Sequence, residues 1–347
     1  MPDPTPAGGP PSALEVLDDK AVASLIPERP ARGHKGTFGK LLVIAGSLDY
    51  AGAALLVCQA AGRSGAGLVT LAVPESIQPL FAAKVVEATT MALPEDDVEE
   101  VEPDDALARI MDHEHDALVV GPGLRPGLAT ADLIGALLAV QDETGPPPAV
   151  VDAEALRSLA VRDEWWERVH RACVLTPHPG EFGRLRAASG IEPGADGDLA
   201  IDDTAREAAA RDAAARWGQV VVLKGAYTVV ASPDGRAARA PFENPALASG
   251  GTGDVLAGTI GALLAQGLSS YDAARLGVYL HGAAGDVVRD RLGDAGLLAG
   301  DLPIEIALAR KRLAALVQSR ARPTRLGFGA VGPSSSRIEG APPSGGS

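Results

Sequence analysis

The stretch LLVIAGSLDYAGAALLVCQAAGRSGAGLVTLAV, residues 41–73, contains the pattern that decides the fold. Two short apolar runs, 41–45 and 68–73, flank a segment of small and apolar residues with helical spacing, 51–62. Runs that are apolar on both faces are typical of buried parallel strands, and the helix between them covers one face of the sheet. The stretch therefore predicts a strand, a helix and a second, parallel strand.

The same alternation continues along the chain. Further strands are predicted at 117–120, 149–151, 174–176, 220–223 and 228–231, and further helices at 130–140, 201–217, 255–266, 272–291 and 304–319. The turn sequence SPDG at 232–235 predicts one antiparallel hairpin. We therefore expect an α/β fold with a mainly parallel central sheet covered on two sides, whose ligands bind beyond the carboxyl ends of the strands.

Composition excludes several classes of partner. The chain has 347 residues, with 31 Lys and Arg against 45 Asp and Glu, and a formal charge of −14. This balance argues against nucleic acid or an anionic membrane surface as partner. Cys58 and Cys173 lie in apolar surroundings, which favours buried thiols in a reducing compartment. Without a membrane-length apolar run or a signal peptide pattern, a cytoplasmic protein is expected.

Both ends are rich in Pro, Gly and Ser. We expect disordered segments at 1–13 and 323–347, with one globular domain at 14–322. The acidic segment EDDVEEVEPDD, residues 95–105, predicts a solvated surface connection rather than a metal site.

Three turns at strand ends carry candidate binding residues. Ala53 lies among small residues that open the helix at 51–62, where a ligand could approach free backbone N–H groups. Gly123 belongs to the tight turn GPGL at 121–124, and His178 is held between two prolines. Each also has a purely structural reading: tight packing for Ala53, a plain turn for Gly123 and a structural or exposed side chain for His178.

Lys224 directly follows the apolar run VVVL and begins the segment KGAYT, Lys224 to Thr228. A lysine at a strand end beside a glycine can direct its ammonium group at phosphate oxygens. The alternative is an edge lysine whose head reaches solvent, and the scarcity of lysine in this chain disfavours it.

The segment NPALASGGTGD, residues 244–254, runs into a buried helical pattern. Its glycines can turn successive N–H groups toward an anion at the helix N-terminus. Asp254 is then either a favourable first-turn carboxylate or a proton acceptor for a nucleophilic hydroxyl. The segment lacks the Lys-Ser/Thr of a P-loop, which excludes that class of NTPase.

These motifs together resemble those of the ADP/ATP-dependent NAD(P)H-hydrate dehydratases, members of the ribokinase-like superfamily. The resemblance covers nearly all of the globular stretch through HKGTFGK (34–40), AGSLDYAGAALL (45–56), RSGAGLVTLAVPE (63–75), GPGL, LTPHPGEF, VVLKGAYT, NPALASGGTGDVLAGTIGALLAQG (244–267) and YLHGAAGD (279–286). It implies a ribokinase-like three-layer αβα sandwich. It also implies repair of NADH or NADPH hydrated at the nicotinamide ring: ADP phosphorylates the ring hydroxyl, and elimination of phosphate restores the double bond, with AMP as the other product.

The resemblance also implies roles for single residues. Asp254 would accept the proton of the ring hydroxyl, with Gly251 and Gly253 among the catalytic residues. The anion hole for the phosphoryl group would comprise Gly250, Gly251, Thr252 and Gly253. Contacts to the hydrated dinucleotide would come from Ala53, Gly123, His178 and Asp254. Contacts to AMP or ADP would come from Lys224, Gly225, Ala226, Tyr227, Thr228 and Gly253.

The family requires Mg²⁺, which would bridge phosphate oxygens; the motifs indicate no protein ligands for it. The resemblance also leads us to expect a homotetramer. Many relatives carry an epimerase domain before this region, but only about 30 residues precede His34, so we expect the epimerase to be a separate chain. The motifs do not decide between ADP and ATP or between NADH and NADPH. Two alternatives stay open: an ATP-dependent kinase of a small vitamin precursor such as hydroxyethylthiazole or a hydroxymethylpyrimidine, and a nucleotide sensor without turnover.

Overall fold

The computed structural model describes residues 13–96, 100–142, 145–191, 199 and 202–321. The two predicted disordered ends lie outside these residues, apart from residue 13. The described chain forms one ten-stranded sheet in the order β1-β10-β9-β8-β7-β6-β5-β2-β3-β4. Its strands are β1 (Glu15–Val16), β2 (Lys40–Ile44), β3 (Leu68–Pro74), β4 (Thr89–Leu93), β5 (Ala117–Val120), β6 (Ala149–Val151), β7 (Cys173–Leu175), β8 (Val220–Leu223), β9 (Val229–Ala231) and β10 (Ala237–Arg239).

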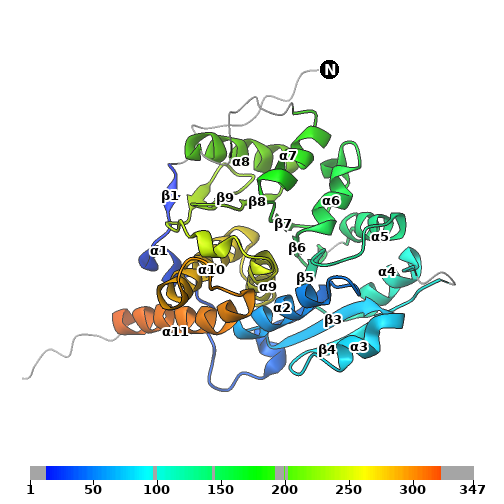
Figure 1. The fold of residues 1–347 in the computed structure, drawn as a ribbon, viewed down its shortest axis with the longest axis horizontal. Coiled ribbons are helices and arrows are strands. Elements are labelled where there is room, and N and C mark those ends of the chain that lie inside the picture. The colour runs from blue at the N-terminus through cyan, green and yellow to red at the C-terminus, as the bar shows by residue number, and fades with distance from the viewer. Residues whose placement is uncertain (1–12, 97–99, 143–144, 192–198, 200–201, 322–347) are drawn as a thin grey trace, which may run out of the picture.

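Eleven helices are described. They are α1 (Asp19–Ala23), α2 (Ala51–Arg63), α3 (Gln78–Ala82), α4 (Pro103–Asp112), α5 (Leu128–Leu138), α6 (Glu154–Ala160), α7 (Pro179–Ala188), α8 (Asp203–Trp217), α9 (Thr252–Ala265), α10 (Ser270–Leu292) and α11 (Leu302–Ala321). Helices α4 to α8 lie on one side of the sheet and α1, α2, α9, α10 and α11 on the other (Figure 1). No helix in the described residues is long and apolar enough to span a bilayer.

The core is divided by the sheet into two apolar layers. Alternate residues of one strand enter opposite layers: Leu41 and Val43 of β2 pack toward α2 and α9, whereas Leu42 and Ile44 pack toward α5. Both sets are at most 1% exposed, as expected for a strand between two helical layers. The predicted three-layer α/β architecture is confirmed.

Seven neighbouring strands, from β8 to β4 in the sheet order, run parallel. Their carboxyl ends therefore meet at one edge. β9 pairs antiparallel with both β8 and β10, which confirms the hairpin predicted around residues 232–235. This arrangement brings the turns after β2, β5, β6, β7 and β8 side by side.

Two of the segments discussed above have more regular structure than the sequence predicted. The acidic stretch is only partly a surface connection. Glu95 forms an isolated antiparallel β-bridge with Val101, and the chain is helical from Pro103. The proline and two acidic residues lie in the first turn of α4, where both residue types are favoured. Pro179 likewise begins α7, so the prolines around His178 mark a helix start as well as a rigid turn. In both places proline fits the first turn of a helix because it needs no N–H donor there.

Candidate functional site

The glycine-rich turn before α9 is shaped by a left-handed glycine and by the hydrogen bonds of Thr252. Gly251 has a φ of 89°, a left-handed conformation that favours glycine, and it caps the helix. The Thr252 hydroxyl lies 2.7 Å from the carbonyl oxygen of Leu247 and 2.9 Å from that of Ser249. The turn therefore presents the first N–H groups of a 14-residue helix at the carboxyl edge of the sheet.

Asp254 lies in the first turn of α9 and is half-buried. Burial, and next the nearby carboxylate of Asp152, raise the pKa of Asp254 to about 7, although Lys224 opposes this shift. A carboxyl group with such a pKa is protonated and ionised in comparable amounts near neutral pH. It is therefore poised to accept a proton there.

A lysine and two carboxylates lie beside this turn. Lys224 Nζ donates to Asp152 Oδ1 at 2.9 Å and lies 3.8 Å from Glu181 Oε2. Burial alone would lower the pKa of Lys224, but the carboxylates of Asp152, Glu181 and Asp254 together raise it, so the ammonium stays charged. A Cβ built on Gly253 would lie 3.4 Å from Lys224 Nζ and 3.9 Å from Asp152 Oδ2, which places the cluster against the glycine turn.

Sequence reasoning missed Asp152 and assigned no role to Glu181. Asp152 directly follows β6, as Lys224 follows β8, and this position at a strand end was the available signal. The turn after Asp152 is also strained, because Ala153 has a φ of 50°. Only the sheet order shows that a single strand, β7, separates the ends of β6 and β8.

His178 has a clear structural role. Its Nδ1 accepts hydrogen bonds from the N–H of Gly180 at 3.0 Å and Glu181 at 3.4 Å, so it caps α7. Glu181 returns a hydrogen bond by accepting from the His178 N–H at 2.9 Å. The cap orients both side chains at the site. The His178 side chain is 52% exposed, and its Nε2 lies 3.5 Å from Glu181 Oε1.

Ala53 and Gly123, predicted to contact the same ligand, lie together. A Cβ on Gly123 would lie 2.8 Å from the Ala53 Cβ and 2.7 Å from the Tyr50 carbonyl oxygen. With a φ of 66°, Gly123 also has a conformation that other residues rarely adopt. This position needs glycine for packing as well as for any contact with a ligand.

The segment Lys224 to Thr228 forms one wall of a cavity of about 580 Å³, which the glycine turn closes on the other side through Thr252 and Gly253. Five of the six predicted nucleotide-binding residues line it, and Tyr227 does not. The Tyr227 hydroxyl instead donates to Glu243 at 2.9 Å, and the residue has a φ of 51°.

A buried arginine holds this segment from behind. Arg206 of α8 is 1% exposed, and its guanidinium donates to the carbonyl oxygens of Leu223, Lys224 and Ala226. Burial lowers the pKa of Arg206. Its two terminal nitrogens donate to the three carbonyl oxygens, whereas its Nε has no hydrogen-bond partner among the described residues. Because these carbonyls face Arg206, the opposite face of the segment is left for the cavity.

The side chains present fit a magnesium ion held mainly by phosphate oxygens. Within the described residues, no group of three His, Cys, Asp or Glu side chains has the geometry of a complete metal site. The carboxylates of Asp152 and Glu181 are nevertheless close to the glycine turn and largely buried. Mg²⁺ commonly takes one or two carboxylates and completes its shell with water and phosphate.

A family model described as NAD(P)H-hydrate dehydratase matches residues 41–307, which includes every residue of the candidate site. The chain belongs to the NAD(P)H-hydrate dehydratase family.

Relatives within the family extend this finding. The chain is 44% identical over 282 residues to a bifunctional NAD(P)H-hydrate repair enzyme of Moorella thermoacetica, covering 80% of this chain and 50% of that one. It is 38% identical over 289 residues to an ADP-dependent (S)-NAD(P)H-hydrate dehydratase of Neisseria meningitidis, covering 82% and 89%. The chain thus spans about half the length of the bifunctional relatives.

Solved structures agree with the dehydratase assignment. An ADP/ATP-dependent NAD(P)H-hydrate dehydratase of Bacillus subtilis, co-crystallised with ATP and Mg²⁺, matches with a TM-score of 0.71 at 33% identity. The match covers 86% of this chain and 99% of the other. A ribokinase-like superfamily protein of Enterococcus faecalis matches with a TM-score of 0.67 at 24% identity, which supports the predicted ribokinase-like fold. These findings favour a dehydratase over the vitamin-precursor kinase.

Proposed function

We propose that this dehydratase-family chain catalyses the ADP-dependent dehydration of (6S)-hydrated NADH or NADPH and releases AMP and phosphate. The observation that carries the proposal is the position of Asp254, with a pKa of about 7, at the glycine turn beside Lys224. This arrangement pairs a proton acceptor with an anion-binding turn, as transfer of a phosphoryl group to a hydroxyl requires.

The reaction divides into two steps. In the first step, Asp254 takes the proton from the ring hydroxyl. The hydroxyl oxygen attacks the terminal phosphorus of ADP, and AMP leaves. N–H groups of the glycine turn and the ammonium of Lys224 stabilise the negative charge that shifts between oxygens. The ring nitrogen lone pair then expels phosphate, and loss of a proton from the adjacent carbon restores the double bond.

The remaining roles are those that the sequence motifs predict. Lys224, Gly225, Ala226, Tyr227, Thr228 and Gly253 would bind the nucleotide, and Ala53, Gly123, His178 and Asp254 the hydrated ring and its ribose. Asp152 and Glu181 would hold Mg²⁺ together with phosphate oxygens; when bound, it neutralises charge on the phosphates. A homotetramer, a cytoplasmic location and a functional partnership with a separate epimerase belong to the same proposal.

One assay tests the proposal against its two alternatives. Purified protein is mixed with acid-hydrated NADH and ADP, and both phosphate release and the near-ultraviolet absorbance of the reduced ring are followed. Recovery of the absorbance with one phosphate per ring is the expected result. A sensor would bind both ligands without turnover, and a vitamin-precursor kinase would consume ATP only when given its own alcohol. Repeating the assay with ATP and with hydrated NADPH determines the preferred donor and substrate.

A further inference from the structure

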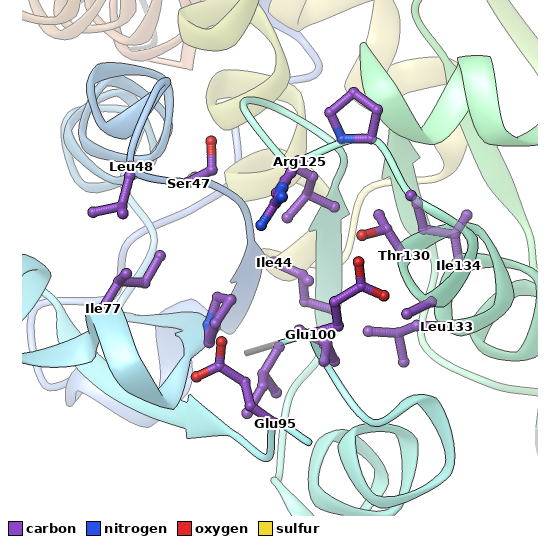
Figure 2. Close-up of a pocket in the computed structure, with 18 of the residues that line it drawn as sticks. Ile44, Ser47, Leu48, Ile77, Glu95, Glu100, Arg125, Thr130, Leu133 and Ile134 are labelled. Atoms are coloured by element: carbon purple, nitrogen blue, oxygen red, sulfur yellow. The ribbon is translucent and has the colours of Figure 1, made fainter. Parts of the chain in front are cut away.

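A second cavity, of about 260 Å³, lies at the same sheet edge between the carboxyl ends of β2 to β5 and helix α5. Its deep walls are apolar and include Ile44, Leu133 and Ile134, each at most 4% exposed (Figure 2). Its mouth is polar and charged, with Asp49, Glu95, Glu100 and Arg125. An apolar chamber with a few polar groups at its entrance is typical of a site for a small organic ligand.

Two loops connect this cavity to the proposed substrate site. The loop after β2 contributes residues 46–49 to the cavity and leads directly to Ala53, while the loop containing Gly123 continues into Leu124 and Arg125. The N–H of Gly46 donates to the Pro122 carbonyl oxygen at 2.8 Å, so the loops lie side by side. A ligand held at Ala53 and Gly123 therefore lies next to the mouth of this cavity.

Large apolar side chains are exposed on the segments that line the cavity. Leu48, a lining residue, is 69% exposed, and two residues next to lining residues in the chain, Tyr50 and Leu128, are 60% and 84% exposed. Isolated exposed apolar residues are common, but Leu48 adds apolar surface at the cavity itself that a ligand could cover.

We propose that this cavity binds the adenosine half of the hydrated dinucleotide, which rests on the function proposed above. A dinucleotide has two bases joined by a pyrophosphate, so a ligand whose nicotinamide ring meets Asp254 must place its second base elsewhere. The cavity is smaller than the roughly 300–1,000 Å³ of pockets that hold whole ligands, and it suits one base with its ribose. The apolar walls pack against the faces of adenine, and the polar mouth meets the ribose hydroxyls.

The charges at the mouth also distinguish the two forms of the dinucleotide. Among the described residues that line the cavity, three carry carboxylates and one, Arg125, is a cation, so the local charge is negative. Both oxygens of Glu95 already accept hydrogen bonds from Ser76, which leaves Asp49 and Glu100 to meet a ligand. Figure 2 shows Glu100 and Arg125 extending over the cavity from opposite sides. Carboxylates accept hydrogen bonds from a ribose 2′-hydroxyl and repel a 2′-phosphate. The cavity therefore favours hydrated NADH over hydrated NADPH.

The test compares a whole and a truncated substrate. Ala129 is half-buried and lines the cavity, and Ala129→Phe fills it. We expect the KM for hydrated NADH to rise by about tenfold or more, as for a comparable steric change in an apolar pocket. The KM for hydrated, reduced nicotinamide mononucleotide, which lacks the adenosine half, should equal that of the wild type. The matched control is Ala88→Phe, because Ala88 is a half-buried alanine that lines a different cavity.

Failure of this inference is distinguishable from failure of the proposed function. Equal effects of Ala129→Phe on both substrates, or no effect on either, overturn the cavity assignment while the dehydratase function stands. Absence of turnover of both substrates by the wild type overturns the function and, with it, the assignment. If Ala129→Phe melts at a lower temperature than Ala88→Phe, the milder filling variant Thr130→Leu is measured in the same way.

The charge preference has its own test. The wild type should have a higher kcat/KM for hydrated NADH than for hydrated NADPH, and Asp49→Asn should reduce that ratio roughly twofold to fivefold at low salt. Asp294→Asn, a substitution of an exposed carboxylate outside the cavity, should leave the ratio unchanged. A wild-type preference for hydrated NADPH, or equal effects of the two variants, overturns the assignment of the acidic mouth.

Discussion

Asp254 carries the chemistry because its surroundings change what a carboxyl group does. An exposed aspartate in the first turn of a helix is ionised at neutral pH and stabilises the helix. Here burial and the carboxylate of Asp152 disfavour the charged form, whereas Lys224 favours it. The resulting pKa of about 7 gives a base that can accept a proton and release it in the same cycle.

Asp254→Asn should separate rate from binding. Turnover should fall by about 10²–10⁴-fold because the proton acceptor is lost. Affinity for ADP should hold or improve because one negative charge beside the phosphates is gone. Single-turnover phosphate release and calorimetric titration of ADP measure the two effects. The control is Asp272→Asn, which removes a first-turn carboxylate from α10. Near wild-type turnover in Asp254→Asn would contradict the mechanism.

Lys224 is expected to act on the nucleotide more than on the dinucleotide. Lys224→Ala removes a charge-assisted contact worth about 1.5–3 kcal/mol, so AMP should bind at least about tenfold more weakly while NADH affinity changes little. Separate titrations of AMP and NADH measure this. Lys40→Ala is the matched control, since Lys40 pairs with Glu114 near the opposite end of β2. Unchanged AMP affinity in Lys224→Ala would rule out the assignment.

At the scale of elements, helix α8 supports the segment between β8 and β9 from the side opposite the cavity. Arg206 of α8 donates to three carbonyl oxygens in this segment, those of Leu223, Lys224 and Ala226. A Cβ on Gly225 would lie 2.7 Å from Arg206 Nη2, so glycine is needed for this close approach. Arg206 is therefore a positioning residue: it would orient the nucleotide-binding segment without touching the nucleotide.

Arg206→Met should weaken nucleotide binding beyond its cost in stability. Three carbonyls lose their donor, so the protein should be destabilised by a few kcal/mol, and AMP should bind about tenfold more weakly as the segment relaxes. Arg171→Met is the matched control, because Arg171 is also fully buried and donates to the carbonyls of Leu137 and Pro147, away from the cavity. Arg206→Lys should restore part of the AMP affinity. Equal AMP affinity in the two methionine variants at comparable melting temperatures would show a purely structural role.

For the whole molecule, two titratable groups at the site act in opposite directions on stability. His281 lies beneath the glycine turn with its Nε2 2.9 Å from the Thr252 carbonyl oxygen, so it is the neutral donor, and burial lowers its pKa to about 4. Unfolding restores its ordinary pKa of 6.5, so its contribution to stability is lost as the pH falls from about 6.5 to about 4. Asp254 does the reverse, because its pKa rises from 3.8 to about 7 on folding.

We therefore expect the two titrations to offset each other in the wild type between about pH 6.5 and about pH 4. Asp254→Asn leaves only the His281 effect, and acidification over this window should then cost about 3 kcal/mol more than in the wild type. His281→Gln, which keeps a donor for Thr252, leaves only the Asp254 effect and should shift the balance by a similar amount the other way. Urea unfolding at both ends of the window measures this. Parallel pH profiles for all three proteins would contradict the expected offset.

Much of the fold could be predicted because its signals are local. The runs at 41–45, 117–120 and 220–223 are strands within a residue of the predicted bounds, and the apolar period after Asp254 belongs to α9. Segments with weaker signals were missed: β4 begins with two threonines, and α4 follows an acidic stretch that resembles a loop. Their structure depends on packing against the sheet, as with Met91 and Ile110 in the core.

The sequence by itself determined the parallel sheet and the glycine turn. It also identified Asp254 and the KGAYT segment that begins with Lys224 as functional motifs. Both were possible because apolar periodicity and turn chemistry act over a few residues. The tertiary structure alone decided that Asp152, Lys224 and Asp254 meet, that Arg206 supports the nucleotide segment and that a second cavity adjoins the first. These features join residues far apart in the chain. Burial and neighbouring charge, which set the pKa of Asp254, exist only once the strands lie in their final order.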